Sequence, residues 1–325
     1  MQIVLDTRGL QLSMRNQCFL IETEGESRMI HPQRISSILI TAACRISSPV
    51  LLLAAECQIP VVICNACGKP QARLWSPKFL NTSALRRKQY QYTIHEGAMK
   101  WAEEIILLKI QGQTDNLRYI VNRKPSLKAE ADKAIHGIGV QLARLQPTDP
   151  AAQTPERKKQ LLFCEAYAAA QYWQLAGTKL PMPFTFTNRV KRDPPDAFNA
   201  CINYLYGMLR NQMEAAVLSI GLDPALGIMH RDGYCMPSLV FDLMEPFRPV
   251  TDKMLITAIL QTEWPAGMME LQNEKNRISK AGRKWLIDLF IGRLHARVLH
   301  RERTTTLQNH LLTEVKHLAD KIREL

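Results

Sequence analysis

A histidine and two acidic residues come close together in the stretch 221–249, and a third acid stands alone upstream. His230 follows residues that break a helix, so we expect it on a non-helical segment. Asp242 and Glu245 are three residues apart and would share one face of a helix. The neighbours of both carboxylates are apolar, and burying a bare charge is costly. Each carboxylate must therefore be paired with a cation, protonated or bound to a metal ion.

Glu165 is the third acid, because it is the only acid between Glu156 and Asp193 and lies in an otherwise apolar helical stretch. Such a lone acid is either the partner of an arginine or a metal ligand. One imidazole nitrogen with two or three carboxylates suits Mn²⁺ or Mg²⁺, whereas a zinc site more often shows additional His or Cys ligands. The alternative is structural: a buried core histidine and an i,i+3 salt bridge between Glu245 and Arg248.

Two kinds of secondary structure must position these residues, and they divide the chain near Pro77. Before it, short apolar runs are separated by turn compositions, which predicts strands. The expected strands are 2–5, 10–14, 18–23, 35–40 and 60–64, with a helix at 49–57. After it, apolar residues recur every three to four positions, which predicts helices. The expected helices are 84–111, 126–145, 156–176, 196–220, 238–246, 278–300 and 306–323.

The predicted fold is therefore α+β, with a small N-terminal β-rich domain over residues 1–76 and a larger all-helical domain over residues 77–325. The length of 325 residues agrees with about two domains. Hydrophobic residues make up 46% of the chain, which is enough for real cores and excludes disorder as the main state.

The chain is basic, with 42 Lys and Arg against 30 Asp and Glu and a formal net charge of +12. Residues 1–75 carry a surplus of only two positive charges, and the rest of the chain carries ten. The stretch 271–303 alone holds nine basic and three acidic residues. A phosphate-bearing partner is the favoured explanation, although composition alone does not separate nucleic acid from an acidic membrane surface.

The apolar runs, the N-terminal residues and the cysteine spacing all indicate a cytoplasmic protein. No apolar run reaches the length of roughly 18–20 residues that a spanning helix needs, and the N-terminus does not resemble a signal peptide. The cysteines show no spacing typical of a disulfide framework. Cys64 and Cys67 form a single Cys-x-x-Cys pair with no second Cys or His pair nearby, so a turn with two small thiols is favoured over a zinc site.

Several motifs follow one another in a recognisable order. They are Gly9-Leu10-Gln11-Leu12, Ile46-Ser47-Ser48-Pro49, Ile59-Pro60-Val61-Val62, Asn188-Arg189, 193–200, 204–209, 221–224, His230 and 242–249 with Asp252. Together they closely resemble the family of CRISPR-associated protein one, the integrase of CRISPR adaptation. The resemblance extends over essentially the whole chain, and only residues 301–325 carry no matching motif.

The resemblance implies a metal-dependent DNA endonuclease and integrase whose active site lies in the helical domain. It implies Glu165, His230 and Glu245 as catalytic residues and metal ligands, with Mg²⁺ or Mn²⁺ as cofactor. Asp242 matches a second acid that the family often has near the metal, either as an acceptor behind the ligands or as a ligand of a second ion. The third ligand is Asp in some members and Glu in others, so the resemblance leaves open which of Asp242 and Glu245 binds the metal directly. The attacking group would be the 3′-hydroxyl of a short captured DNA, and the electrophile a phosphate at the edge of a CRISPR repeat. His230 could instead act as a general acid.

The expected partners also follow from the resemblance. They are double-stranded DNA (the prespacer and the CRISPR repeat), a second copy of the chain bound through the β-rich domain, and the small CRISPR-associated protein two, all in antiviral defence. Candidate DNA contacts are Arg189, Arg248, Arg283, Lys284 and Arg293. Arg248 either contacts the scissile phosphate or orients Glu245. Two other functions fit the same residues: hydrolysis by water at this site, and a non-catalytic DNA binder whose carboxylates are structural.

Overall fold

The computed structural model describes residues 2–23, 25–35, 37–64, 70–74, 83–145, 155–177, 180–230, 233, 236–261, 263–272 and 275–325. The chain divides into two compact units, Met1–Ala84 and Leu85–Leu325. The domain boundary expected near residue 76 falls within 75–82, outside the described residues.

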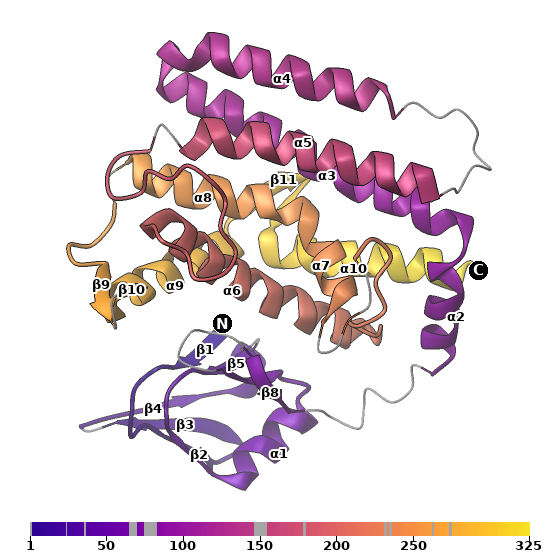
Figure 1. Cartoon of the computed structure of the whole chain (residues 1–325). Coiled ribbons are helices and arrows are strands. Elements are labelled where there is room, and N and C mark those ends of the chain that lie inside the picture. The colour runs from indigo at the N-terminus through magenta and orange to yellow at the C-terminus, as the bar shows by residue number, and fades with distance from the viewer. Residues whose placement is uncertain are drawn as a thin grey trace. The chain divides into compact units, whose positions relative to one another are not determined.

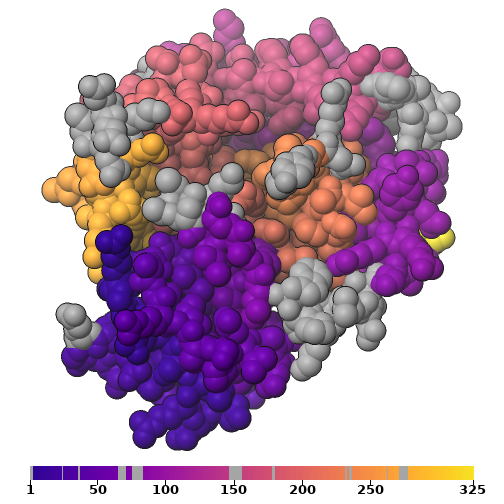
Figure 2. All heavy atoms as spheres, turned by 60° about the horizontal axis from the view of Figure 1, so that its bottom comes forward, coloured from indigo at the N-terminus to yellow at the C-terminus, as the bar shows by residue number. Residues whose placement is uncertain are grey.

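The N-terminal unit is built from two four-stranded sheets with the strand orders β4-β3-β2-β6 and β1-β5-β7-β8. The strands are β1 (Gln2–Leu5), β2 (Gln11–Arg15), β3 (Cys18–Thr23), β4 (Glu26–Ile30), β5 (Ser37–Ile40), β6 (Arg45–Ile46), β7 (Val61–Cys64) and β8 (Pro70–Arg73). A short turn of 3₁₀ helix, η1 (Pro32–Arg34), precedes β5, and the helix α1 (Ser48–Glu56) has a proline in its first turn. Side chains such as Leu5, Phe19 and Ile38 form a core of this unit, which appears in indigo and purple in Figure 2.

The second unit is mostly helical (Figure 1). Its helices are α2 (Ser83–Thr93), α3 (Glu96–Arg123), α4 (Lys128–Ala143), α5 (Pro155–Gly177), α6 (Ala197–Ile220), α7 (Ser238–Met244), α8 (Arg248–Leu260), α9 (Lys280–His295) and α10 (Leu307–Arg323), with the short 3₁₀ turns η3 (Pro125–Leu127) and η4 (Glu245–Phe247). Helices α3, α4 and α5 pack against one another, and α6 packs against α7, α8, α9 and α10. Trp101, Tyr172 and Phe198 belong to the large core between these helices.

The predicted α+β class, with a strand-rich N-terminal part and a helical remainder, is confirmed. The expectation that the second part is entirely helical needs one correction, because two antiparallel hairpins interrupt it. They are β9 (Met269–Gln272) with β10 (Lys275–Ile278), and β11 (Arg297–His300) with β12 (Arg303–Thr306).

Two predicted helices have different bounds for local reasons. The stretch 84–111 contains two helices, because the side chain of His95 accepts a hydrogen bond from the backbone N–H of Gly97 and starts α3 anew. The stretch 278–300 ends its helix at His295, and the chain then enters strand β11. No described helix is both long and apolar enough to cross a membrane.

Candidate active site

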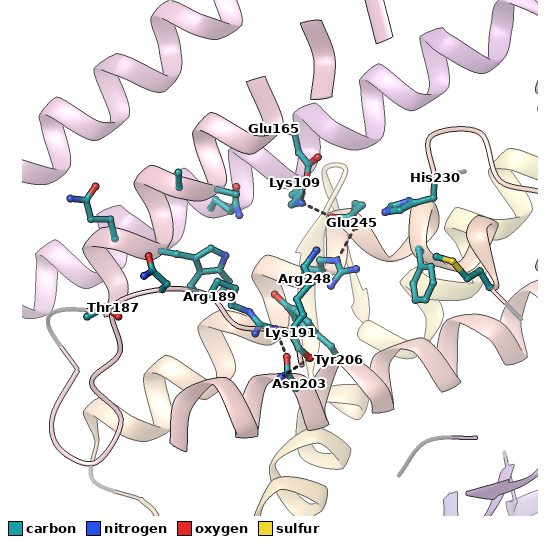
Figure 3. A pocket seen from close by; sticks show the side chains of 18 residues that line it. Lys109, Glu165, Thr187, Arg189, Lys191, Asn203, Tyr206, His230, Glu245 and Arg248 are labelled. Atoms are coloured by element: carbon teal, nitrogen blue, oxygen red, sulfur yellow. Dashed lines mark hydrogen bonds and ion pairs between the residues drawn. The ribbon is translucent and has the colours of Figure 1, made fainter. Parts of the chain in front are cut away.

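A cavity of about 1040 Å³ lies within the helical unit, and Glu165, His230 and Glu245 all line it (Figure 3). Glu165 comes from α5, His230 from the segment between α6 and α7, and Glu245 from η4. The structure therefore brings the three predicted ligands together from distant parts of the sequence. The cavity is also lined by Lys109, Gln113, Trp173, Thr187, Asn188, Arg189, Lys191, Asn203, Tyr206, Phe241 and Arg248, among others.

The chain around Glu245 changes helix type twice within a few residues. Pro246 and Pro249 each stand in the first turn of a helix, where a missing backbone N–H costs little. They set the start of η4 at Glu245 and the start of α8 at Arg248. Glu245 is therefore held on a rigid corner and is almost fully buried, with 4% of its surface exposed.

Lys109 of α3 lies between the two carboxylates of the cavity. Its ammonium hydrogen-bonds and ion-pairs with Glu165, and its Nζ lies 2.6 Å from Oε2 of Glu245. Lys109 is itself buried, and although burial alone would lower the pKa of its ammonium, Glu245 and Glu165 outweigh that effect and raise it. Lys109 is thus a charged counter-ion for both acids.

The charge of Glu245 is stabilised from two sides. Arg248 donates from Nε to Oε1 of Glu245 at 2.9 Å, which is the i,i+3 salt bridge that the spacing allowed. Burial raises the pKa of Glu245, but Arg248 and Lys109 outweigh burial and bring it down to about 2. Glu245 is therefore ionised throughout the physiological pH range, as a metal ligand must be.

Asp242 and His230 form a buried-carboxylate and imidazole pair. Asp242 is completely buried, and its Oδ1 lies 2.6 Å from Nδ1 of His230. The same carboxylate accepts the backbone N–H groups of Ile228, Met229 and His230 at 2.6–3.0 Å. Asp242 thus holds the histidine and its backbone. Because Nδ1 of His230 is hydrogen-bonded to Asp242, Nε2 is the ring nitrogen available to bind a ligand. The imidazole ring points towards Glu245 (Figure 3).

The segment that carries His230 begins where α6 ends. Gly221 ends that helix with φ at 93°, a left-handed conformation that glycine adopts without a steric penalty. From α5, Lys158 donates from Nζ to the carbonyl oxygen of Ile228 at 3.0 Å. Side chains from other elements therefore replace helical hydrogen bonds along this segment.

Cations and an aromatic ring continue the cavity away from the carboxylates. The guanidinium of Arg248 lies 4.6 Å from the ring centroid of Tyr206, and that of Arg189 lies 5.5 Å from the same centroid. Arg189 also donates to Asn199 and Asn203, which fixes its direction. The Tyr206 hydroxyl donates to Asp252 at 2.6 Å. The result is a preorganised, cation-rich wall that suits phosphate groups.

The remaining predicted residues lie elsewhere. Arg283, Lys284 and Arg293 are on α9 and are not among the described side chains of the cavity. Burial lowers the pKa of Arg293, and Arg283 donates to the carbonyl oxygen of Ile278. Cys64 is buried on β7, whereas Cys67 lies outside the described residues.

The donor set fits a hard divalent cation. Oε2 of Glu245 is buried, and the ammonium of Lys109 at 2.6 Å is its partner among the described residues, so a lone pair of this oxygen remains for a ligand. Two carboxylates and an imidazole match the oxygen-rich coordination of Mg²⁺ or Mn²⁺. Among the described residues, no three such groups lie close enough to enclose an ion, and Lys109 stands between the two acids. Metal binding must therefore compete with, or displace, the lysine.

Sequence reasoning missed Lys109. A signal exists in hindsight, because Lys109 is the only charged residue between Glu104 and Asp115 and occupies a position of the buried face of α3. Tyr206 was part of a recognised motif, but nothing in its sequence neighbourhood indicated that two arginines stack on it.

The fold and the site together define a class of protein. In this class a strand-rich unit is joined to a mostly helical unit, and the helical unit gathers two carboxylates and an imidazole in a cation-lined cavity. The sequence model of a protein family, described as CRISPR associated protein Cas1, matches residues 3–291 of this chain. The chain belongs to this family, as its motifs predicted.

Curated relatives agree with this membership. The chain is 29% identical to the CRISPR-associated endonuclease Cas1 of Korarchaeum cryptofilum over 263 residues, which cover 78% of this chain and 76% of the relative. It is 34% identical to a CRISPR-associated endonuclease Cas1 of Saccharolobus solfataricus over 230 residues, which cover 70% of this chain and 61% of the relative.

Solved structures share the fold. A casposase bound to an integration product matches with a TM-score of 0.82 at 20% identity, covering 99% of this chain and 90% of that chain. A Cas1 protein from Thermotoga maritima matches with a TM-score of 0.77 at 19% identity, covering 99% and 97%. A chain of a Cas6-RT-Cas1–Cas2 complex matches with a TM-score of 0.78 at 21% identity, covering all of this chain and 35% of that chain.

Proposed function

We propose that the chain is a metal-dependent DNA endonuclease and integrase of CRISPR adaptation, which inserts short captured DNA into a CRISPR array. One observation carries the proposal: in a member of the Cas1 family, Glu165, His230 and Glu245 converge on one cavity whose other wall is cationic. Two observations support it: the curated relatives are named as CRISPR-associated endonucleases, and a casposase shares the fold.

In this proposal Glu165, His230 and Glu245 hold a divalent cation, either Mg²⁺ or Mn²⁺. Such an ion neutralises charge on the non-bridging phosphate oxygens and lowers the pKa of an attacking hydroxyl. Asp242 acts behind the ligands: it keeps the proton of His230 on Nδ1, so that Nε2 offers a lone pair. We assign Asp242 this orienting role because its oxygens already accept hydrogen bonds from three backbone amides.

The cationic wall positions the DNA strand. Arg189 is oriented by Asn199 and Asn203, and Lys191 lines the cavity beside it, so both can hold phosphates that flank the reacting one. Arg248 fixes Glu245 and faces the same cavity. In transesterification the 3′-hydroxyl of the incoming DNA gives up its proton and its oxygen bonds to phosphorus. The bond from phosphorus to the 3′-oxygen of the target strand breaks, and that leaving oxygen takes up a proton. Water in place of the incoming hydroxyl gives hydrolysis at the same residues.

Strand joining tests the proposal directly. Short duplex DNA with labelled 5′ ends and free 3′-hydroxyls is incubated with a repeat-containing plasmid and Mn²⁺ or Mg²⁺, using the wild type, E165Q, H230A and E245Q. We expect joined products with the wild type alone, and DNA binding in gel shifts by all four proteins. E156Q, an exposed change on the same helix as Glu165, is the matched control and should join normally. Full joining by E165Q or H230A would overturn the ligand assignment, and free 5′-phosphate ends without joining would favour a nuclease.

The proposed assembly follows from the reaction. Insertion needs one attack on each strand, so two active sites must act together. We propose that the N-terminal β-rich domain pairs two copies, because Met29 on the sheet-edge strand β4 is 53% exposed. We propose that the small protein Cas2 bridges such dimers, because a chain with this fold occurs in the Cas6-RT-Cas1–Cas2 complex. Light scattering of the full chain should give the mass of a dimer. Because the proposed target is chromosomal DNA, we propose that the protein acts in the cytoplasm of a prokaryote.

A further inference from the structure

The segment Gly221 to His230 has no regular secondary structure, yet it must present one imidazole to the cavity. Its distal end is held by Asp242 and Lys158, as described above. Its proximal end needs a separate anchor, because the turn at residues 224–225 and the irregular backbone around it would otherwise let the whole segment shift.

That anchor comes from α2. Gln89 is 2% exposed, and its side-chain amide pairs with the backbone of Asp223 in both directions. The Asp223 N–H donates to Oε1 of Gln89 at 2.8 Å, and Nε2 of Gln89 donates to the Asp223 carbonyl oxygen at 2.9 Å. The same Nε2 lies 3.4 Å from the carbonyl oxygen of Leu226. One turn earlier on α2, Arg86 donates from Nε to the carbonyl oxygen of Gly221 at 3.2 Å.

The chemistry of this contact is specific. The side-chain amide of Gln89 accepts from the N–H and donates to the C=O of the same residue, Asp223, as a neighbouring strand would. An ionised glutamate would keep the acceptor and lose the donor, and a leucine of similar size would lose both. Because the contact is buried, water cannot replace the lost hydrogen bonds at low cost.

We infer that Gln89 is a positioning residue for His230: it clamps the start of the His230 segment so that Nε2 of the imidazole is held at the cavity. This inference rests on the proposed function, because it assigns Gln89 a role in the divalent-cation site. Gln89 itself is not among the described side chains of that cavity, so its effect must pass through the segment.

Amide hydrogen exchange of the metal-free full-length chain tests the clamp without reference to activity. In Q89L and Q89E we expect the amides of residues 222–230 to exchange at least about tenfold faster than in the wild type, with the core of α3 unchanged. Q91L is the matched control, since Gln91 lies on the same helix but is exposed. If Q89L does not fold, two other variants still test the clamp: Q89E, and R86M, which removes the hydrogen bond to Gly221. Unchanged exchange at 222–230 in all three variants, or the same change in Q91L, would overturn the clamp.

Calorimetric titration with Mn²⁺ then tests the link to His230. We expect Q89L to bind Mn²⁺ about tenfold more weakly than the wild type, and H230A to weaken binding further. In an H230A background, Q89L should cause little additional loss, because its effect passes through that imidazole. Fully additive losses would show that Gln89 does not act through His230. If H230A leaves Mn²⁺ binding unchanged, the proposed metal site fails, while faster exchange in Q89L would still establish the clamp.

Discussion

Replacing Lys109 with methionine is the sharpest test of the electrostatics of the cavity. Methionine keeps the length of the side chain and the helical propensity of α3, and removes the charge. Glu245 has 5% of its side chain exposed and Glu165 has 25%, and Lys109 is the cation that both share. K109M therefore leaves two acids facing one another, with Arg248 as the remaining ion-pair partner of Glu245 among the described residues.

The expected cost follows from burial. Removing one partner of a buried ion pair typically costs about 3–5 kcal/mol, and the lower end applies here because Arg248 remains and Glu165 is partly solvated. For a folding unit of this size, 1 kcal/mol corresponds to about 2–4 °C in melting temperature. We therefore expect metal-free K109M to melt about 6–12 °C below the wild type.

A divalent cation should narrow this difference in stability between K109M and the wild type. In K109M the ion meets no competing ammonium, and at a hundred times its Kd a ligand adds about 2.7 kcal/mol. Mn²⁺ should thus restore most of the lost melting temperature in K109M and stabilise the wild type less. Calorimetric melting with a chelator and with excess Mn²⁺ measures both effects, and K100M, an exposed change on the same helix, serves as the control.

Two results would refute this reasoning. One is a metal-free K109M that melts with the wild type, which would mean that Lys109 does not neutralise the acids. The other is equal stabilisation of both proteins by Mn²⁺, which would mean that the lysine and the ion do not compete for the same carboxylates.

Two further predictions concern buried carboxylates. D242N places an amide nitrogen where the carboxylate accepts backbone N–H groups, so Mn²⁺ affinity should fall about 10–100-fold in calorimetric titration, and an unchanged affinity would contradict the orienting role. Burial raises the pKa of Asp252 from 3.8 to about 7, so the folded state retains a proton that the unfolded state has already lost, and the stability contributed by this residue is lost as pH rises from about 4 to 7. The D252N side chain cannot ionise, so the variant should gain stability relative to the wild type as pH rises across that window. Denaturant unfolding of both proteins at pH 5 and pH 8 measures this gain. If the difference in unfolding free energy between the two proteins is the same at both pH values, Asp252 does not titrate there.

The sequence predicted most helices because their apolar period is local information. Helices α5, α6 and α10 begin and end within a residue or so of the expected positions. The hairpin of β11 and β12 was missed because its turn residues, Arg301 and Glu302, adopt positive φ without glycine. Arg301 is held there by ion pairs to Glu104 and Glu314, which only the folded chain brings together.

Some residues of the candidate site could likewise be predicted from the sequence, and others could not. Breaks in periodicity and isolated acids made Glu165, His230, Asp242 and Glu245 candidates, because a polar residue in an apolar context is visible in the sequence. The family resemblance then suggested Glu165, His230 and Glu245 as the ligands. The part played by Lys109 was not visible, since its two partners lie on other elements and a lone lysine on a helix usually reaches solvent. The spacing of Asp242 and Glu245 suggested a shared role, yet helix type changes between them, and one holds the histidine segment while the other faces the cavity.

The charge balance of the cavity has a consequence for the order of binding. Lys109 and Arg248 carry two positive charges, and Glu165 and Glu245 carry two negative charges, so these four side chains are neutral together. A divalent cation added among them leaves two positive charges in excess, which two phosphates of a DNA strand offset. Each ligand then raises the affinity for the other by the same factor, because binding free energies are reciprocal. If Glu165, His230 and Glu245 hold a divalent cation as proposed, we expect the protein to bind that ion weakly between reactions and more tightly once DNA lies in the cavity, so that the substrate itself promotes loading of the ion.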